Sequence, residues 1–175
     1  VMTQDEAFEV LGEVAAPARL VTHARLVLEA GDAILAAVAS VGVTVDRDLV
    51  RAGAVLHDAG KARYPAELDG AGDRHEAEGE RMLLARGVET KLARVCRSHA
   101  KWKDMECSAE ELLVALADKL WKGARVAELE ARVVDALAQR AGCDRWDLFV
   151  TLDDAFERVA AGADQRLARS RVSGA

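Results

Sequence analysis

The residues best suited to chemistry in this chain are imidazoles and carboxylates that fall on, or at the ends of, predicted helices. In chain order they are His23, His57, Asp58, His75, His99 and Asp118. Such side chains are the usual protein ligands of iron, manganese and zinc. Helical bundles build metal sites from ligands that several facing helices contribute. The set therefore predicts a buried metal site that uses all four histidines of the chain.

Several of these residues have a simpler interpretation when each is taken alone. His23 lies between Leu20 and Val27 on an apolar helix face, and an inward histidine is often a hydrogen-bonded core residue. His75 and His99 stand at predicted helix ends in polar surroundings, which is typical of solvated histidines. It is the joint pattern, and not any single histidine, that points to metal.

The two aspartates add physical arguments of their own. His57 and Asp58 lie in the last predicted turn before Gly60, where exposed helix carbonyls favour a cation. Their side chains would project about 100° apart, so one ion between these directions could accept both. Asp118 lies in a predominantly apolar helix, where a buried carboxylate needs an ion, a proton or a partner such as Lys122.

The elements that must position these residues are helices. Leu, Ala, Glu, Arg and Val dominate, aromatic residues make up 4% of the chain, and alternating strand-like stretches are hard to find. The fold class is therefore all-α: a single-domain bundle of about seven helices over residues 1–169, followed by a short basic tail at 170–175. A short first helix is predicted at 3–14, and further helices are predicted at 17–41, from Asp46 or Asp48 to Gly60, and at 75–86, 89–99, 108–121, 126–141 and 144–169.

Composition and charge exclude several classes of protein. With 24 basic and 30 acidic side chains, the net charge of −6 gives no general attraction to nucleic acid or to an anionic membrane. The longest uncharged apolar run, 34–45, is shorter than the roughly 20 residues of a membrane-spanning helix. Three widely spaced cysteines do not form a disulfide framework, and no signal peptide is visible, so we expect a cytoplasmic protein.

The order H…HD…H…H…D, with gaps of 34, 17, 24 and 19 residues, resembles the metal-binding signature of the HD-domain superfamily. Members of that superfamily are all-helical and are mostly metal-dependent phosphohydrolases. The resemblance spans His23 to Asp118 and implies a helical bundle of the HD-domain type. The last two predicted helices lie outside it.

Shorter stretches extend this resemblance. Gly60 and Lys61 after the His-Asp pair are similar to the common H-D-x-G-K form of the family. His75 with Gly79, and the stretch 115–119 with Arg125 beyond it, resemble bacterial HD hydrolases that cleave diadenosine tetraphosphate. In that group the glycine lets the helix pack closely.

The resemblance also implies a number of ions. Members with one ion need only the first histidine, the His-Asp pair and the final aspartate, whereas the additional His75 and His99 match the binuclear branch. By that resemblance the first ion would be held by His23, His57, Asp58 and Asp118. Asp58 would bridge to a second ion on His75 and His99. Iron or manganese is expected, and occupancy by one ion is the alternative.

Two such ions, about 3.5 to 4 Å apart, can clamp phosphate oxygens and lower the pKa of a bridging water, which gives hydroxide near neutral pH. The expected function is therefore a metal-dependent phosphohydrolase that cleaves a phosphoester or phosphoanhydride of a nucleotide or small phosphorylated metabolite. Asp58 would act catalytically through the ions. Lys61 would neutralise charge that develops on the phosphoryl group, unless it is an ordinary loop lysine.

A local excess of positive charge favours an anionic substrate. Residues 86–103 carry six basic side chains and one acidic one, although a solvated basic helix face would have the same composition. Lys101 and Arg125 are candidates for phosphate contact. Trp102 is a candidate for stacking on a nucleobase or for closing the pocket, whereas Trp121 and Trp146 are expected in the core.

Two other functions use the same residues. A mixed-valence di-iron oxygenase of the HD fold, acting on a phosphonate or polyol, has the same ligand set, and Tyr64 near the His-Asp pair could gate such a centre. A non-catalytic, ligand-sensing HD module is the third interpretation. The expected partner is a small anionic, nucleotide-like substrate, without nucleic acid or membrane. The sequence leaves the oligomeric state open.

Overall fold

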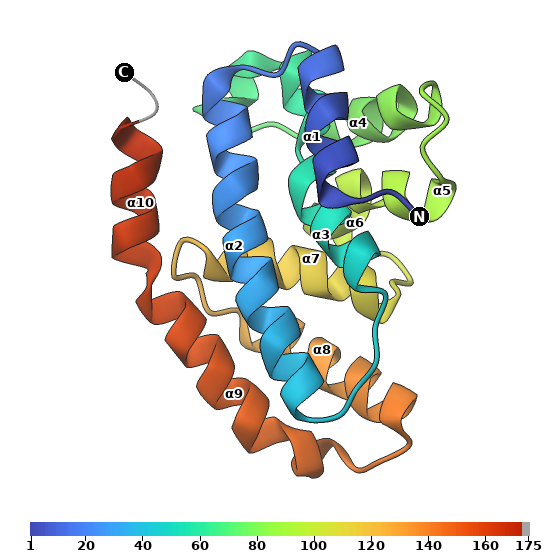
Figure 1. Ribbon diagram of the computed structural model, residues 1–175, viewed down its shortest axis with the longest axis vertical. Helices are drawn as coiled ribbons and strands as arrows, with labels where there is room; N and C mark the ends of the chain where they lie inside the picture. The colour runs from blue at the N-terminus through green and yellow to red at the C-terminus, as the bar shows by residue number, and fades with distance from the viewer. Residues whose placement is uncertain (173–175) are drawn as a thin grey trace.

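The computed structural model describes residues 1–172, and within that range the chain folds into helices without a strand (Figure 1). Its α-helices are α1 (Gln4–Glu13), α2 (Ala18–Ser40), α3 (Arg47–Leu56), α4 (Arg74–Leu84), α5 (Thr90–Ala93), α6 (Val95–Lys101), α7 (Ala109–Leu120), α8 (Ala127–Ala141), α9 (Arg145–Ala161) and α10 (Ala163–Val172). Two 3-10 helices, η1 (Ala59–Ala62) and η2 (Pro65–Leu68), connect α3 to α4. The predicted all-α class is confirmed.

Polar caps fix where several helices begin. The Thr3 side chain caps α1, and Asp46 caps α3 by accepting a hydrogen bond from the backbone N–H of Leu49. The predicted capping box at the start of α7 is present: Ser108 accepts from the N–H of Glu111, whose carboxylate accepts in return from the N–H of Ser108. These bonds satisfy amide donors that have no partner within their own helix.

Helix boundaries differ from the prediction in three places. α3 ends at Leu56, and the chain continues as η1. The helix predicted at 89–99 is divided into α5 and α6, which reaches Lys101. The helix predicted at 144–169 is divided at Gly162 into α9 and α10. Because α10 runs to Val172, the predicted tail begins as helix, and its last residues, 173–175, lie outside the described range.

The core forms around α2 and α7. α7 crosses behind α2 in Figure 1, and both helices pack against α3. Ile34 and Val38 of α2, and Leu113 and Leu116 of α7, are completely buried, so the apolar face predicted for α2 faces the core. α8 and α9 close one end of the bundle, and α10 lies beside α2. No helix of residues 1–172 is both long and apolar enough to cross a membrane.

A buried carboxylate ties the start of α7 to two other elements. Glu110 is 6% exposed, and its carboxylate accepts hydrogen bonds from the Arg140 guanidinium of α8 and from the backbone N–H of Asp46. Burial would raise the pKa of Glu110, but these donors outweigh it and lower the pKa below 4.5. The carboxylate therefore stabilises the fold in its ionised form.

We expect Glu110→Gln to lower the free energy of unfolding by about 2 kcal/mol at pH 7. Because the folded-state pKa is below the unfolded one, the stabilisation is complete above pH 4.5 and is lost as the pH falls through the folded value. Urea unfolding at pH 7 and near pH 3 measures this difference. Glu128→Gln, at an exposed pair with Lys103, is the control, and an equal loss at both pH values would contradict the prediction.

Candidate metal centre

Five separate elements bring the six predicted ligands together. His57 is the residue after α3, and Asp58 follows it at the start of η1. The other ligands come from α2 (His23), the first turn of α4 (His75), α6 (His99) and the last turn of α7 (Asp118). All but His23 are at most 8% exposed, and His23 is partly buried. The simpler interpretation of His75 and His99 as solvated residues is therefore wrong.

The Asp58 carboxylate lies at the centre of this cluster. Its Oδ2 atom is 3.2 Å from His23 Nε2. Its Oδ1 atom is 3.3 Å from His75 Nε2 and 3.5 Å from His99 Nε2. The two oxygens thus face different groups of histidines, which is the arrangement that a carboxylate shared between two ions requires.

The half of the cluster nearest α2 contains two histidines and the second aspartate. His23 Nε2 and His57 Nε2 are 3.2 Å apart. Asp118 Oδ1 is 3.4 Å from His57 Nε2 and 3.7 Å from His23 Nε2. Two imidazole nitrogens and one carboxylate oxygen therefore lie close together. The lysines nearest to them are Lys61, beside Asp58, and Lys119, beside Asp118.

Backbone carbonyls orient two of the imidazoles. His57 Nδ1 donates to the carbonyl of Ala54 at 2.8 Å, and His99 Nδ1 donates to the carbonyl of Val95 at 3.0 Å. A carbonyl only accepts, so each Nδ1 carries a proton and each ring turns its Nε2 atom toward the cluster. Ligating histidines are held in the same way in metal sites.

His75 is oriented by Glu67, a residue of η2 that sequence reasoning did not identify. The Glu67 carboxylate accepts from His75 Nδ1 at 2.6 Å and from the backbone N–H of His75 at 3.1 Å. It also accepts from the N–H of Arg74, so Glu67 caps α4, whereas the side chain of Asp73, the residue before the helix, makes no capping bond. The one signal in the sequence is that Glu67 is an acidic residue eight positions before His75, in the stretch between two predicted helices.

Two glycines let these elements approach closely. Gly60 is not in the left-handed conformation; its backbone packs directly on α4, where an added Cβ would be 1.9 Å from the carbonyl oxygen of His75. An added Cβ at Gly79 would be 2.9 Å from Cys96 Sγ and 3.1 Å from the nitrogen of Gly60. η1 and α4 can pack this closely because neither glycine has a side chain, and the close packing brings Asp58 next to His75.

The donor set fits metal ions. Asp58 Oδ1 and His75 Nε2 are buried and make no hydrogen bond, which is unusual for such atoms unless a ligand is bound. Three groups of ligand atoms each lie within 4.8 Å of one another. They are His23, His57 and Asp58; His57, His99 and Asp118; and Asp58, His75 and His99. Nitrogen and carboxylate ligands of this kind suit iron, manganese or zinc.

The protonation of the cluster also suits metal binding. Burial and the nearby charge of His57 lower the pKa of His99 to about 4, so this imidazole is neutral at pH 7. Burial would raise the pKa of Asp58, but the charge of His57 and the close approach of the His23 and His75 imidazoles hold it well below its usual range. The pKa of Asp118 is also lowered, despite burial, by its hydrogen bond with His57. Both carboxylates are thus anionic.

A cavity of about 430 Å³ opens onto the cluster. Its cationic lining residues are Arg19, Lys61, Lys119 and Lys122. Lys61 Nζ lies 2.8 Å from Asp58 Oδ2, and Lys122 has no ion pair or hydrogen bond among the described side chains. Trp121 forms part of the wall, and its ring packs edge-on against His23 with centroids 5.0 Å apart. Arg166 of α10 donates a hydrogen bond to the backbone carbonyl of Trp121 and so helps to fix the position of this residue.

The structure contradicts three of the predicted substrate contacts. The nitrogens of Arg125 bind three carboxylates, those of Glu130, Asp153 and Glu157, on the α8–α9 surface away from this cavity. Trp102 is 4% exposed and packs in the core. Lys101 does not line the cavity; its ammonium pairs with Glu76 at 3.2 Å and Asp73 at 3.7 Å, although Glu76 itself reaches the cavity wall.

The basic excess at residues 86–103 is neutralised by tertiary ion pairs. Each of its six cations lies within 4 Å of a carboxylate: Arg86 of Glu13, Lys91 of Asp46, Arg94 of Glu111, Arg97 of Glu80, Lys101 of Glu76 and Lys103 of Glu128. None of the six lines the cavity. The balanced, solvated face is therefore the correct interpretation. Trp146, expected in the core, is 66% exposed.

We expect Glu67→Gln to weaken metal binding at the His75 half of the site by about 10- to 100-fold, because Gln lacks the charge that orients His75 and raises its basicity. Gln retains a carbonyl that can cap α4, so the fold should persist. Titration of apo-protein with Mn²⁺ measures the affinity, with Glu78→Gln as the control, because Glu78 belongs to α4 but pairs with Arg81 and not with a ligand. Unchanged affinity would show that Glu67 serves α4 alone.

A family model for the HD domain matches residues 20–122. The match covers all six clustered ligands and Lys61, and it leaves out α1 and the helices from α8 onward. Neither the curated proteins nor the solved structures gave a significant match. Membership of this family indicates metal binding and, in general, metal-dependent hydrolase activity. The matched range is more than half of the chain, which therefore belongs to the HD-domain family.

Proposed function

We propose that this protein is a phosphohydrolase with a binuclear metal centre, acting on a nucleotide or another small phosphorylated metabolite. The observation that carries the proposal is the position of Asp58, whose Oδ2 faces His23 and whose Oδ1 faces His75 and His99. One ion would be held by His23, His57, Asp58 and Asp118. The other would be held by Asp58, His75 and His99.

Iron or manganese suits this set of imidazoles and carboxylates. When bound, a pair of such ions supplies positive charge against phosphate oxygens and lowers the pKa of a coordinated water. The chain's own contribution is to orient three of the ligand imidazoles, through the Nδ1 bonds of His57, His75 and His99.

Side chains of the cavity favour a phosphorylated substrate. Lys61 lies beside Asp58 at the floor, where its ammonium can stabilise negative charge on a phosphoryl group. Lys122 is at the wall without a carboxylate partner and is free to bind a phosphate oxygen. Leu68 and the Trp121 ring line the same cavity and can contact an apolar part of the substrate. Tyr64, in contrast, lies under Arg74 and does not line the cavity, so nothing beyond the ligand set favours an oxygenase.

The proposal is tested with protein that has been purified without chelator and loaded with Mn²⁺ or Fe²⁺. Phosphate release is measured on nucleoside mono-, di- and triphosphates, dinucleoside polyphosphates and sugar phosphates. We expect activity on at least one class and an increase in KM in Lys122→Ala, with little change in Lys103→Ala, whose ammonium pairs with Glu128 outside the cavity. A protein that binds two ions but is silent on the whole panel would contradict the proposal.

A further inference from the structure

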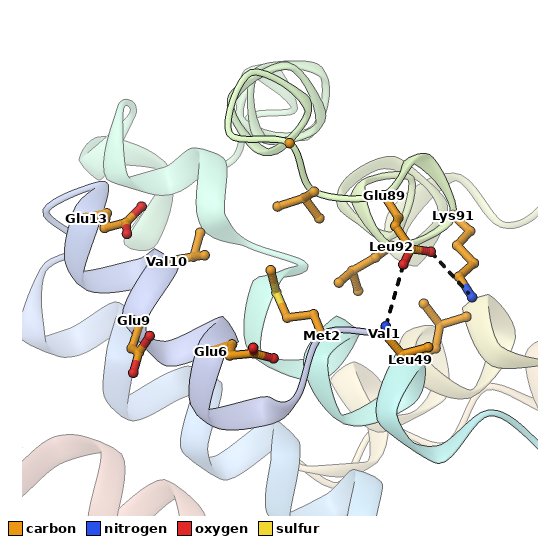
Figure 2. A pocket seen from close by; sticks show the side chains of 12 residues that line it. Val1, Met2, Glu6, Glu9, Val10, Glu13, Leu49, Glu89, Lys91 and Leu92 are labelled. Carbon is orange, nitrogen blue, oxygen red and sulfur yellow. Dashed lines mark ion pairs between the residues drawn. The ribbon is translucent and has the colours of Figure 1, made fainter.

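A second cavity, of about 310 Å³, shares no lining residue with the cavity at the metal cluster (Figure 2). It is a groove between α1 and the segment 87–92, which contains the turn before α5 and most of α5 itself. Its floor is apolar: Met2, Val10, Leu49, Val88 and Leu92. α1 lies outside the HD-domain match, and Leu49 and the segment 87–92 lie inside it, so this groove forms where α1 meets the matched region.

The groove has an acidic rim. Glu6, Glu9 and Glu13 line it from α1, and Figure 2 shows them following one another along that helix. They are three and four residues apart, which places them on one helix face. Glu89 stands on the opposite side, beside Lys91. Residues 1–18 contain four acidic side chains and no basic one, so the charged side chains that α1 gives the groove are all anionic. The cations that line the groove are the N-terminal ammonium of Val1, 3.7 Å from Glu89 Oε1, and Lys91.

These carboxylates do little for the fold itself. Glu9 has no ion pair or hydrogen bond among the described residues, and the only partner of Glu13 is Arg86 at 3.9 Å. Glu13 also occupies the last turn of α1, where the helix dipole disfavours a negative charge. Like charges three and four residues apart repel each other along the helix. Only Glu6 has a local role, in the capping box with Thr3.

An apolar floor with an anionic rim is complementary to one kind of ligand. Amphipathic segments dock by placing apolar anchors in a groove while flanking charges meet the rim. A nucleic acid would be repelled by the glutamates, and an uncharged apolar segment would leave them without partners. We propose that this groove docks a cationic amphipathic segment of a partner protein, with an apolar anchor on the floor and Lys or Arg side chains on the rim.

The probe is a synthetic, fluorescein-labelled helical peptide with leucines at positions i, i+3, i+4 and i+7 and lysines on its flanks. Its affinity is measured by anisotropy at physiological salt, and its site is mapped by amide chemical shifts. We expect the double variant Glu9→Lys/Glu13→Lys to bind about tenfold more weakly. A peptide with serines in place of the leucines should lose binding to a similar extent, because it lacks the anchors.

The matched control is Asp154→Lys/Asp164→Lys, which changes the net charge equally at two exposed positions of α9 and α10. It should bind the peptide within about twofold of the unmodified protein. Circular dichroism verifies that both double variants fold. Equal weakening in the control, equal binding of the serine peptide, or shifts that map away from α1 and α5 would each overturn the proposal. Metal content and hydrolysis are measured in parallel, and neither result bears on this one.

Discussion

Asp58→Asn is expected to release both metal ions and to abolish hydrolysis. The Asp58 carboxylate is the only group whose two oxygens face the two halves of the cluster. An amide has one neutral oxygen and cannot serve two cations. Loss of an outer hydrogen-bond partner already weakens metal binding by about 10- to 100-fold, so removal of this shared ligand should exceed that loss at both positions.

The measurement is the metal content per chain after dialysis against a weak chelator, together with phosphate release on the best substrate of the panel. We expect metal content to fall to background and the rate to fall by on the order of 1000-fold. His75→Ala is the matched comparison, because it removes a ligand from one half only and should leave one ion. Asp32→Asn, at a surface pair with Arg51 on the far part of α2, should change nothing.

Thermal unfolding of the apo-proteins separates loss of ligation from loss of fold. If apo Asp58→Asn melts near the apo wild type while its metal is absent, the effect belongs to the site. Retention of one tightly bound ion by Asp58→Asn would show that the carboxylate is not shared, and the binuclear arrangement would then be wrong.

The sequence predicted the ligand cluster because the chain has only four histidines and because their order with Asp58 and Asp118 resembles the HD-domain signature. Four histidines and two aspartates in an apolar, helical chain had to be paired or solvated, and the structure buries all but the partly buried His23 at one point. The helices were equally predictable, since capping residues such as Ser108 and Asp46 act locally. Apolar periodicity correctly indicated the inward face of α2.

Side chains that depend on distant partners could not be predicted in this way. Arg125 looked available for phosphate, but three carboxylates on α8 and α9 bind its guanidinium. The positive charge at 86–103 is likewise neutralised by acidic residues that lie on other helices, which the local sequence does not reveal. Glu67 was overlooked because its role exists only once η2 lies against the start of α4. Local pattern identifies ligands more readily than it identifies the neighbours that orient or neutralise them.

Gly60→Ala is expected to produce the largest loss of stability of any single methyl added to the site. The new Cβ would lie 1.9 Å from the His75 carbonyl oxygen and 2.8 Å from the nitrogen of Gly79. All the atoms in its way are backbone, so no side chain can rotate aside, and η1 must separate from α4. Overpacking of this kind should lower the free energy of unfolding by about 3 kcal/mol or more.

The separation of η1 from α4 should also have a specific effect on the metal centre. Asp58 leads into η1 and His75 belongs to α4, so the 3.3 Å approach of Asp58 Oδ1 to His75 Nε2 would be lost, whereas His23 and Asp118 would stay in place. We therefore expect the folded fraction of Gly60→Ala to bind about one ion, with the second lost. Gly12→Ala is the control: no atom lies within 4 Å of its added Cβ, and it should gain about 0.5 kcal/mol in helix α1. Two ions bound to a destabilised Gly60→Ala protein would mean that His75 follows the displaced η1, and that the close contact serves packing alone.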